Sequence, residues 1–311
     1  MPAGQTWTMA DGRAFRVPDR LAHVVVSAFG DVGRDWLERL PGLVADAAST
    51  WGLQVGAPFE PGGNVGWVAP VRRADGGDAV LKVECPGHRN PWAARGLQHW
   101  AGRGAARLFD SDEASQVLLL ELCVPGTNGD ELDVATGNEI VASVLAELHA
   151  VEPPAADEFE PLATLVERSR ETMWDWFDRF ERPVDRGVVA QADEWFTSLT
   201  SSSTDTVLLH GDLGPSNVVL SERGWLAIDP YPVVGDRAFD VGHSLSRCDL
   251  RDAREQVALL ADRLNLDARR IAGWTFACCV ELALECRSVG DAMGFRECLD
   301  RAELLSSQRL V

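Results

Sequence analysis

The chain has 311 residues, of which 46% are hydrophobic and 25% are charged. This composition is typical of a soluble globular protein and excludes disordered, fibrous and disulfide-stapled classes. At roughly 150 residues per domain, the length predicts two domains or two lobes. The formal net charge of −19 disfavours a nucleic-acid partner, because phosphates would be repelled over most of the surface. The opening segment has no apolar signal region, and no long uncharged apolar run follows, so we expect a cytoplasmic protein without membrane association.

The first part of the chain predicts a strand-rich small lobe. Residues 31–51 carry apolar residues at helical spacing, which predicts an N-terminal helical segment interrupted at Pro41. A second helical pattern covers 90–104. Five β-leaning runs, separated largely by turn sequences, are found at 52–59, 65–73, 78–85, 105–110 and 115–124. Together these elements predict an antiparallel sheet with one helix, and we assign residues 1–123 to this lobe.

The rest of the chain predicts a helix-rich large lobe. The segment 124–131 holds a Pro-Gly pair and few large apolar residues, so it is interpreted as the hinge. We assign residues 132–311 to the second lobe. Helical patterns occur at 140–151, 158–182, 187–200, 236–264 and 267–305, with a short β-rich island at 206–229. The predicted fold class is therefore α+β, with two lobes of different composition.

Lysine is almost absent from the sequence. The 29 basic residues comprise 28 arginines and a single lysine, Lys82, which lies in the predicted strand 78–85. An ammonium group is a compact point charge, whereas a guanidinium is a wide planar fork, so a tight phosphate pocket can accept one and reject the other. The sequence therefore predicts that Lys82 occupies a position where arginine does not serve.

The β-rich island carries the residues with the clearest chemical meaning. The segment HGDLGPSN presents His210, Asp212 and Asn217 after an apolar strand, and the hairpin's second arm ends at Asp229. Phosphoryl transfer needs such a set, because one carboxylate orients the attacking hydroxyl while oxygen ligands hold magnesium against the nucleotide phosphates. The spacing predicts Asp212 as the base, and Asn217 and Asp229 as Mg²⁺ ligands. Lys82 is expected to reach the α and β phosphates from the other lobe.

These segments together resemble a known family. HGDLGPSNVVL with a downstream IDP, the lysine in VLKVE and the intervening VLAELHAVEPP are similar to the aminoglycoside phosphotransferase family, relatives of protein kinases. WLERLPGLVADAASTWGL, GWVAPVRRADG and WLAIDPYPVVGDRAFDVGHSL most resemble its streptomycin and hydroxyurea kinase branch. The resemblance covers about residues 35–305. It implies a bilobal protein-kinase-like fold, a nucleoside triphosphate at the hinge, and phosphorylation of a hydroxyl on a small molecule, usually an antibiotic.

Two departures from the family pattern concern the site. The family's loop usually continues H-G-D-L-H, whereas Gly214 stands here in place of the second histidine. The small-lobe helix of the family supplies a glutamate to the strand lysine, but residues 90–104 contain no acidic residue. Glu84 is a candidate substitute, but it lies two residues after Lys82, on the same face of the strand and not opposite it. The partner of Lys82 therefore stays unassigned at this point.

The remaining candidate residues come from the hinge run, from the loop and from the predicted helices. The hinge run is expected to present backbone groups to the nucleotide base, with contacts from Glu121 to Cys123. His210 is expected to brace the loop backbone, and the resemblance assigns supporting roles to Asp236 and Asp240. Two groups of carboxylates share a helical face: Glu281 with Glu285, and Glu171 with Asp175 and Asp178. They are candidates for lining the cleft that binds a polycationic acceptor. The alternative is that they form solvated helix faces.

The sequence thus predicts a magnesium-dependent phosphotransferase that moves the γ-phosphoryl group of ATP, with GTP as the alternative donor, to a hydroxyl of a small antibiotic. A streptomycin-like aminoglycoside is the first expectation for the acceptor, and a nucleoside or other hydroxylated antibiotic is the second. Two alternatives stay open at this point. One is a metabolic kinase acting on a small hydroxylated compound, and the other is a catalytically weak, kinase-like binding protein.

Overall fold

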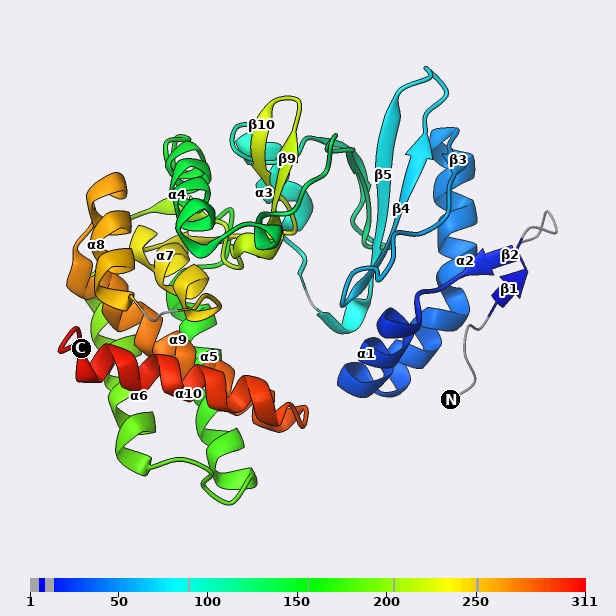
Figure 1. Cartoon of the computed structure of the whole chain (residues 1–311). Helices are drawn as coiled ribbons and strands as arrows, with labels where there is room; N and C mark the ends of the chain where they lie inside the picture. Colours follow the sequence, from blue (N-terminus) through cyan, green and yellow to red (C-terminus); the bar gives the residue numbers. More distant parts are fainter. Residues whose placement is uncertain (1–5, 9–13, 89, 156, 204, 250–251) are drawn as a thin grey trace. The chain divides into compact units, whose positions relative to one another are not determined.

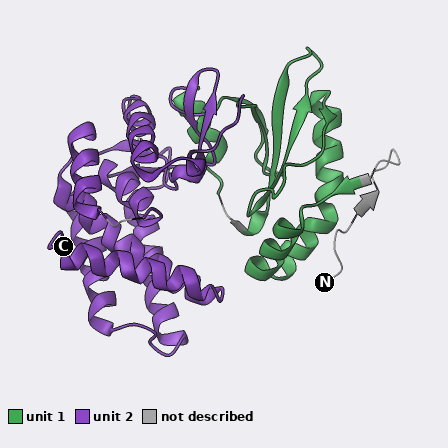
Figure 2. Ribbon diagram, in the orientation of Figure 1, with its two compact units in different colours: residues 1–102, 106–123 green, residues 103–105, 124–311 purple. Residues whose placement is uncertain are grey.

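A computed structural model describes residues 6–8, 14–88, 90–155, 157–203, 205–249 and 252–311 of the chain. Contacts between residues divide the chain into two compact units (Figure 2). The first unit contains residues 1–102 and 106–123, and the second contains residues 103–105 and 124–311.

The first unit is built on a five-stranded antiparallel sheet. Its strand order is β3-β4-β5-β7-β6, and every neighbouring pair is antiparallel. The bounds are β3 (Gln54–Val55), β4 (Gly66–Arg72), β5 (Asp78–Glu84), β6 (Leu108–Asp112) and β7 (Val117–Glu121). Strand β1 (Thr6–Thr8) pairs antiparallel with β2 (Ala14–Arg16) apart from this sheet, and α3 (Ala93–Trp100) lies between β5 and β6 in the sequence.

Helices α1 (Asp19–Phe29) and α2 (Asp31–Trp51) pack on one face of this sheet (Figure 1). Ala79, Leu81 and Val83 of β5 are buried in the core beneath them. Side chains alternate between the two faces of a strand, so Lys82 and Glu84 project from the face opposite α1 and α2. The acidic side chains of these two helices therefore do not share a face of the sheet with Lys82.

The helical segment at the N-terminus differs from the prediction. Helix α2 runs unbroken through Pro41, and α1 lies outside the elements predicted from the sequence. A proline inside a helix costs about 3 kcal/mol, since it removes one hydrogen bond and crowds the preceding turn. Leu40 and Val44, both fully buried on either side of Pro41, each contribute about 1.5–3 kcal/mol of hydrophobic stabilisation. Packing on the sheet therefore outweighs the local preference.

The second unit is mostly helical. Helix α9 lies at its centre and contacts α5, α6, α7, α8 and α10. The bounds are α4 (Val134–His149), α5 (Leu162–Arg179), α6 (Arg186–Ser201), α7 (Arg237–Ser246), α8 (Ala253–Leu264), α9 (Ala268–Ser288) and α10 (Ala292–Ser307). With the sheet of the first unit, this confirms the predicted α+β class. Among the residues described, no helix combines the length and the apolar character that crossing a bilayer requires.

Two small antiparallel pairs in the second unit carry the predicted site. Strand β8 (Val207–Leu209) pairs with β11 (Val233–Gly235), and β9 (Val218–Ser221) pairs with β10 (Gly224–Ala227). The segment predicted as the hinge begins this unit. Its Gly126 N–H donates to Leu220 and its Thr127 carbonyl accepts from Leu220, so this stretch runs along β9.

Candidate active site

The loop after β8 has a backbone conformation that requires glycine. Gly211 has φ of +78°, and a Cβ placed there would lie 1.9 Å from the carbonyl oxygen of Tyr231. The Tyr231 N–H in turn donates to the His210 carbonyl at 2.8 Å. The returning chain therefore passes directly over Gly211, and this close approach sets the direction in which the chain enters Asp212.

Asp240, in the first turn of α7, accepts hydrogen bonds from the backbone of this loop. Its Oδ2 accepts the His210 N–H at 2.9 Å, and its Oδ1 accepts the Gly211 N–H at 2.8 Å. His149, near the end of α4, donates from Nε2 to Oδ2 of the same carboxylate at 2.8 Å. Burial acts to raise the pKa of Asp240, but the bonds from His149 and the loop outweigh it, and the pKa lies below its usual value. Asp240 is thus a fully buried carboxylate with its hydrogen-bonding capacity used by the loop.

His210 braces the loop as a neutral imidazole. Its side chain is fully buried, and burial lowers the pKa of His210 below its usual value. Nε2–H donates to the carbonyl oxygen of Ile228 at 2.9 Å, and Nδ1 accepts the N–H of Asp212 at 3.3 Å. The ring therefore joins the loop to Ile228, the residue that follows β10, and has both nitrogens engaged.

Asp212 and Asn217 lie together at the mouth of this loop. The Asn217 amide nitrogen donates to the Asp212 carbonyl at 2.7 Å and to its carboxylate Oδ2 at 3.3 Å. About 44% of the Asp212 side chain is exposed, so solvent or a ligand can reach the carboxylate. Because the nitrogen end of Asn217 is turned towards Asp212, the end that remains to meet a cation is its oxygen.

Asp229 lies two residues after the end of β10, next to Ile228. The Ile228 N–H donates to the Asn217 carbonyl at 2.9 Å, which places Asp229 one residue from this bond. Asp229 is exposed and has φ of +56°, a left-handed conformation that is uncommon for residues other than glycine and recurs at functional sites. The structure thus brings Asp212, Asn217 and Asp229 to one loop cluster.

The oxygen donors of Asn217 and Asp229 fit magnesium, which binds one or two protein oxygens together with phosphate oxygens and water. When bound there, Mg²⁺ supplies positive charge against phosphate oxygens.

Arg247 and His243, which the sequence reasoning missed, contact Asp212. Arg247 Nη2 lies 3.4 Å from Asp212 Oδ1, and its Nη1 donates to His243 Nε2 at 2.5 Å. Burial, with the charge of Arg247, lowers the pKa of His243 to about 4. His243 is therefore neutral near pH 7, and its 3.7 Å approach to Asp212 is not an ion pair. His243 lies in α7, three residues after Asp240, and Arg247 is the residue that caps the end of this helix.

Glu281 and Glu285 on α9 lie in the electrostatic field of the same arginine. Burial, and secondarily the charge of Glu285, raise the pKa of Glu281 to about 7, against the opposing effects of a hydrogen bond with Ser169 and of Arg247. Burial raises the pKa of Glu285, with the charge of Arg247 opposing this effect and the charge of Asp212 adding to it. These two predicted acceptor residues therefore belong to the surroundings of Asp212.

The other predicted acceptor carboxylates are on the exposed face of α5. Glu171, Asp175 and Asp178 are all exposed, and Asp178 pairs with Arg182 at 3.4 Å. Their geometry corresponds to the solvated helix face that the sequence left open as the alternative.

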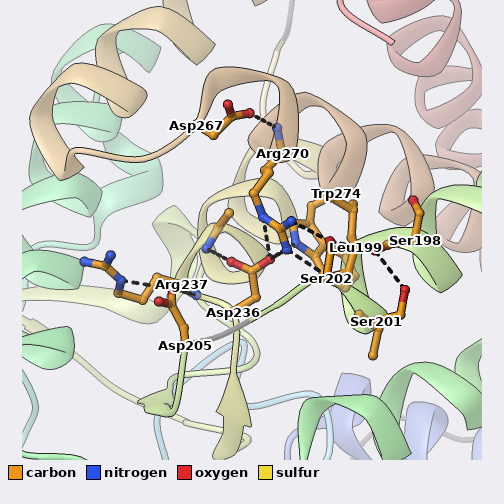
Figure 3. Close-up of polar contacts among 12 residues, drawn as sticks. Ser198, Leu199, Ser201, Ser202, Asp205, Asp236, Arg237, Asp267, Arg270 and Trp274 are labelled. Carbon is orange, nitrogen blue, oxygen red and sulfur yellow. Dashed lines mark hydrogen bonds and ion pairs between the residues drawn. The ribbon is translucent and has the colours of Figure 1, made fainter.

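Asp236 supports the helices beside the loop. It caps α7 by accepting the Ala238 N–H at 3.0 Å, and its Oδ2 accepts from the Trp274 indole at 2.8 Å (Figure 3). Arg270 of α9 donates to the same oxygen through Nε and Nη2. Figure 3 shows Arg270 reaching also to Ser202 and Leu199 at the end of α6. Asp236 therefore joins α6, α7 and α9, while Asp240 holds the loop itself.

In the first unit, Lys82 has an ionic partner in its own strand. Lys82 Nζ lies 2.6 Å from Glu84 Oε1, and both side chains are buried, with 7% and 4% exposed. Glu84 lies two residues after Lys82 on the same face of β5, and this placement brings the two charged groups together. The lysine does not need a glutamate from a helix, because the side chains of Lys82 and Glu84 are long enough to meet on one face of β5.

The predicted base-contacting residues lie at the end of β7. The Glu121 N–H donates to the Arg107 carbonyl at 2.8 Å, and its carboxylate accepts the Arg107 N–H at 3.0 Å. The amide of Glu121 is therefore committed to the sheet. Contacts to a nucleotide base remain a prediction for its carbonyl and for Cys123, which is partly buried.

Comparison with known proteins agrees with this geometry. Residues 55–290 match the family described as aminoglycoside/hydroxyurea antibiotic resistance kinase. The chain belongs to this family. The resemblance drawn from HGDLGPSN and its surroundings is thereby confirmed.

Characterised relatives of this kinase family member align over most of its length. A streptomycin 6-kinase from Streptomyces griseus is 36% identical over 283 residues, covering 86% of this chain and 90% of the relative. A hydroxyurea phosphotransferase from Kitasatospora aureofaciens is 32% identical over 288 residues, covering 90% and 83%. The choline kinase LicA from Streptococcus pneumoniae matches in structure with a TM-score of 0.62 and 15% identity, covering 86% of this chain and 98% of that one. The structural match confirms the predicted kinase-like fold.

Proposed function

We propose that this protein transfers the γ-phosphoryl group of ATP to a hydroxyl of a small cationic antibiotic, with a streptomycin-like aminoglycoside as the first candidate. The observation that carries the proposal is the Asp212 carboxylate. It is partly exposed, carried on a loop fixed by Asp240, and contacted by Asn217. Relatives named as streptomycin and hydroxyurea kinases support the same reaction class.

In this proposal Asp212 acts as the base. Its carboxylate accepts the hydrogen bond of the acceptor hydroxyl and orients the oxygen for in-line attack. Asn217 holds Oδ2, and Arg247 holds Oδ1, so the carboxylate is positioned before the acceptor arrives. Preorganisation of this kind lowers the barrier because the groups need not reorder during reaction.

The remaining nucleotide contacts are proposals on the same basis. Lys82 binds phosphate oxygens as a compact ammonium, and the backbone near Glu121 and Cys123 contacts the base. Asn217 and Asp229 hold the metal. ATP as donor is supported by the kinase family membership, and GTP remains the alternative donor. The acceptor is proposed to be cationic because Glu281 and Glu285 flank the surroundings of Asp212, whereas Arg247 alone would favour an anion.

The test is turnover of γ-labelled ATP, and separately GTP, with Mg²⁺ and a panel of acceptors. The panel contains streptomycin, hygromycin B, hydroxyurea, a nucleoside antibiotic and choline. Labelled streptomycin, formed at a rate at least ten times that with choline, is the expected result. Transfer to choline alone would establish the metabolic-kinase alternative. Nucleotide binding without transfer to any acceptor would establish the binding-protein alternative. Omission of Mg²⁺ with added chelator should abolish transfer.

A further inference from the structure

The ion pair between Lys82 and Glu84 is contained within one strand. Both residues belong to β5, and their charged atoms are 2.6 Å apart in a buried setting. Helices α1 and α2 lie on the other face of the sheet, and α3 carries no acidic residue over Ala93–Trp100. The sheet itself therefore supplies a carboxylate that contacts the lysine, from the same strand.

Gly66 provides the space for this pair. It is directly opposite Glu84 in the β4–β5 register, and Val68 is opposite Lys82. Directly paired residues of antiparallel strands point to the same face. A Cβ at position 66 would lie 3.3 Å from Lys82 Cε and 3.3 Å from the Val83 carbonyl oxygen. The missing side chain at Gly66 thus leaves a gap through which the lysine stem passes.

From these contacts we propose that Glu84 is the positioning residue for Lys82, holding its ammonium in place for phosphate binding from within the same strand. The proposal rests on the proposed function, since it assumes that Lys82 binds phosphate. In a kinase whose glutamate comes from a helix, moving the helix breaks the ion pair and switches activity. Here the pair is fixed by the pleat of β5, so the lysine is aligned whenever the sheet is folded. The structure thus assigns this protein a permanently aligned lysine.

The physical basis is that burial and the hydrogen bond to Glu84 restrict the side-chain conformations of Lys82. A charge-assisted hydrogen bond between side chains two residues apart fixes the end of a lysine chain that otherwise has four rotatable bonds. Removing the carboxylate charge leaves the buried ammonium without this partner. The ammonium would then shift, and transfer depends steeply on the placement of phosphate-binding groups.

The decisive variant is Glu84→Gln, which keeps the shape and removes the charge. We expect kcat/KM for ATP to fall by about 10- to 100-fold, the loss typical of a misplaced or missing charge-assisted bond. The KM for ATP is expected to rise, while the KM for the acceptor stays within about threefold of wild type. Glu84→Asp retains the charge with one methylene fewer, so it should recover part of the loss. Rescue by Asp but not by Gln separates positioning from filling of space.

Gly66→Ala tests the same pair without altering any charge. The new methyl group would press on Lys82 Cε, so the KM for ATP should rise in the same direction as in Glu84→Gln. Gln98→Ala, at an exposed position of α3, is the matched control and should leave the KM for ATP unchanged. Thermal unfolding of each variant without nucleotide identifies loss of fold. If Glu84→Gln does not fold, Gly66→Ala and Glu84→Asp carry the test.

The outcomes separate this proposal from the proposed function. Absence of ATP turnover by the wild-type enzyme would contradict the proposed function. Normal wild-type turnover, with Lys82→Met inactive and Glu84→Gln at wild-type KM and kcat, would overturn the positioning role alone. A Glu84→Gln variant that melts earlier but keeps wild-type kinetics would also overturn it, as would a variant with increased turnover.

Discussion

Arg247 Nη2 lies 3.4 Å from Oδ1 of Asp212, on the side of the carboxylate opposite the Asn217 contact to Oδ2. The guanidinium is itself held by His243, whose Nε2 accepts from Nη1 at 2.5 Å. Burial keeps this imidazole neutral near pH 7, so it can accept a hydrogen bond from a cation. The base of the proposed reaction is therefore fixed on both oxygens.

Arg247→Ala should change kcat and KM in the same direction. The loss of this ion-pair partner of Oδ1 should lower kcat by about tenfold, as expected when a charged contact that positions the base is removed. The KM of a cationic acceptor should also fall, because the variant removes a positive charge beside Glu281 and Glu285. Steady-state kinetics with streptomycin measure both values. Arg287→Ala, at an exposed position on α9, should alter neither. A higher acceptor KM in Arg247→Ala would contradict the account.

Glu281 predicts a pH-dependent contribution to stability. Its carboxyl has a pKa of about 7 in the folded chain against 4.5 as its ordinary value. Between these values the folded state binds the proton more tightly than the unfolded state, so this group's contribution to stability falls as pH rises from about 4.5 to 7. Glu281→Gln removes this effect. The variant should match wild type at pH 4, below both pKa values, and exceed it by about 1–3 kcal/mol at pH 8.5. Denaturant unfolding at both pH values measures the difference, and equal stability at pH 8.5 would refute the prediction.

Asp240→Asn should destabilise the second unit and impair catalysis. The amide offers one acceptor oxygen where the carboxylate receives bonds from His210 N–H, Gly211 N–H and His149. One buried N–H then faces an NH₂ group, at a cost of about 2–4 kcal/mol. Urea unfolding of the variant measures the change. Asp262→Asn, at an exposed position on α8, should stay within about 0.5 kcal/mol of wild type. Wild-type stability of Asp240→Asn would show that the loop does not depend on this carboxylate.

Lys82→Arg should fail although it preserves the charge. The lysine stem passes Gly66 and its ammonium is buried against Glu84, so a wider guanidinium does not fit the same space. We expect kcat/KM for ATP to fall by about tenfold or more, with the loss mainly in KM. Calorimetric binding of a non-hydrolysable ATP analogue measures the affinity directly. Wild-type affinity for the ATP analogue in this variant would show that the site accepts arginine, and that steric fit does not explain the lysine at position 82.

Much of the fold was predictable because its signals are local. The turn sequences separating strands 65–73 and 78–85 predicted neighbouring antiparallel strands, which form as β4 and β5. Pro41 shows where local preference fails, since burial of α2 against the sheet outweighs the cost of an interior proline. The segment 124–131 is predicted as the hinge from its Pro-Gly pair, and the structure adds that residues 126 and 127 hydrogen-bond along β9. Backbone pairing with a strand nearly a hundred residues away leaves no mark in composition.

The candidate site shows the same division. Asp212, Asn217 and Asp229 are close in sequence, and the hairpin brings them together as their spacing predicted. The partner of Lys82 was left open because a residue on the same strand face did not match the family's helix glutamate. Arg247 was missed because one arginine among 28 carries no distinguishing pattern. Its contact with Asp212 depends on how α7 packs beside the loop, which only the tertiary structure shows.

The account depends most on Asp212 as the base for transfer to an antibiotic hydroxyl. The most direct measurement is the rate of label transfer from γ-labelled ATP to streptomycin by wild type and by Asp212→Asn. We predict a loss of about 10²- to 10⁴-fold in kcat, the range for removing a general base, with the KM for ATP nearly unchanged. Transfer by Asp212→Asn at a rate close to wild type would contradict the account.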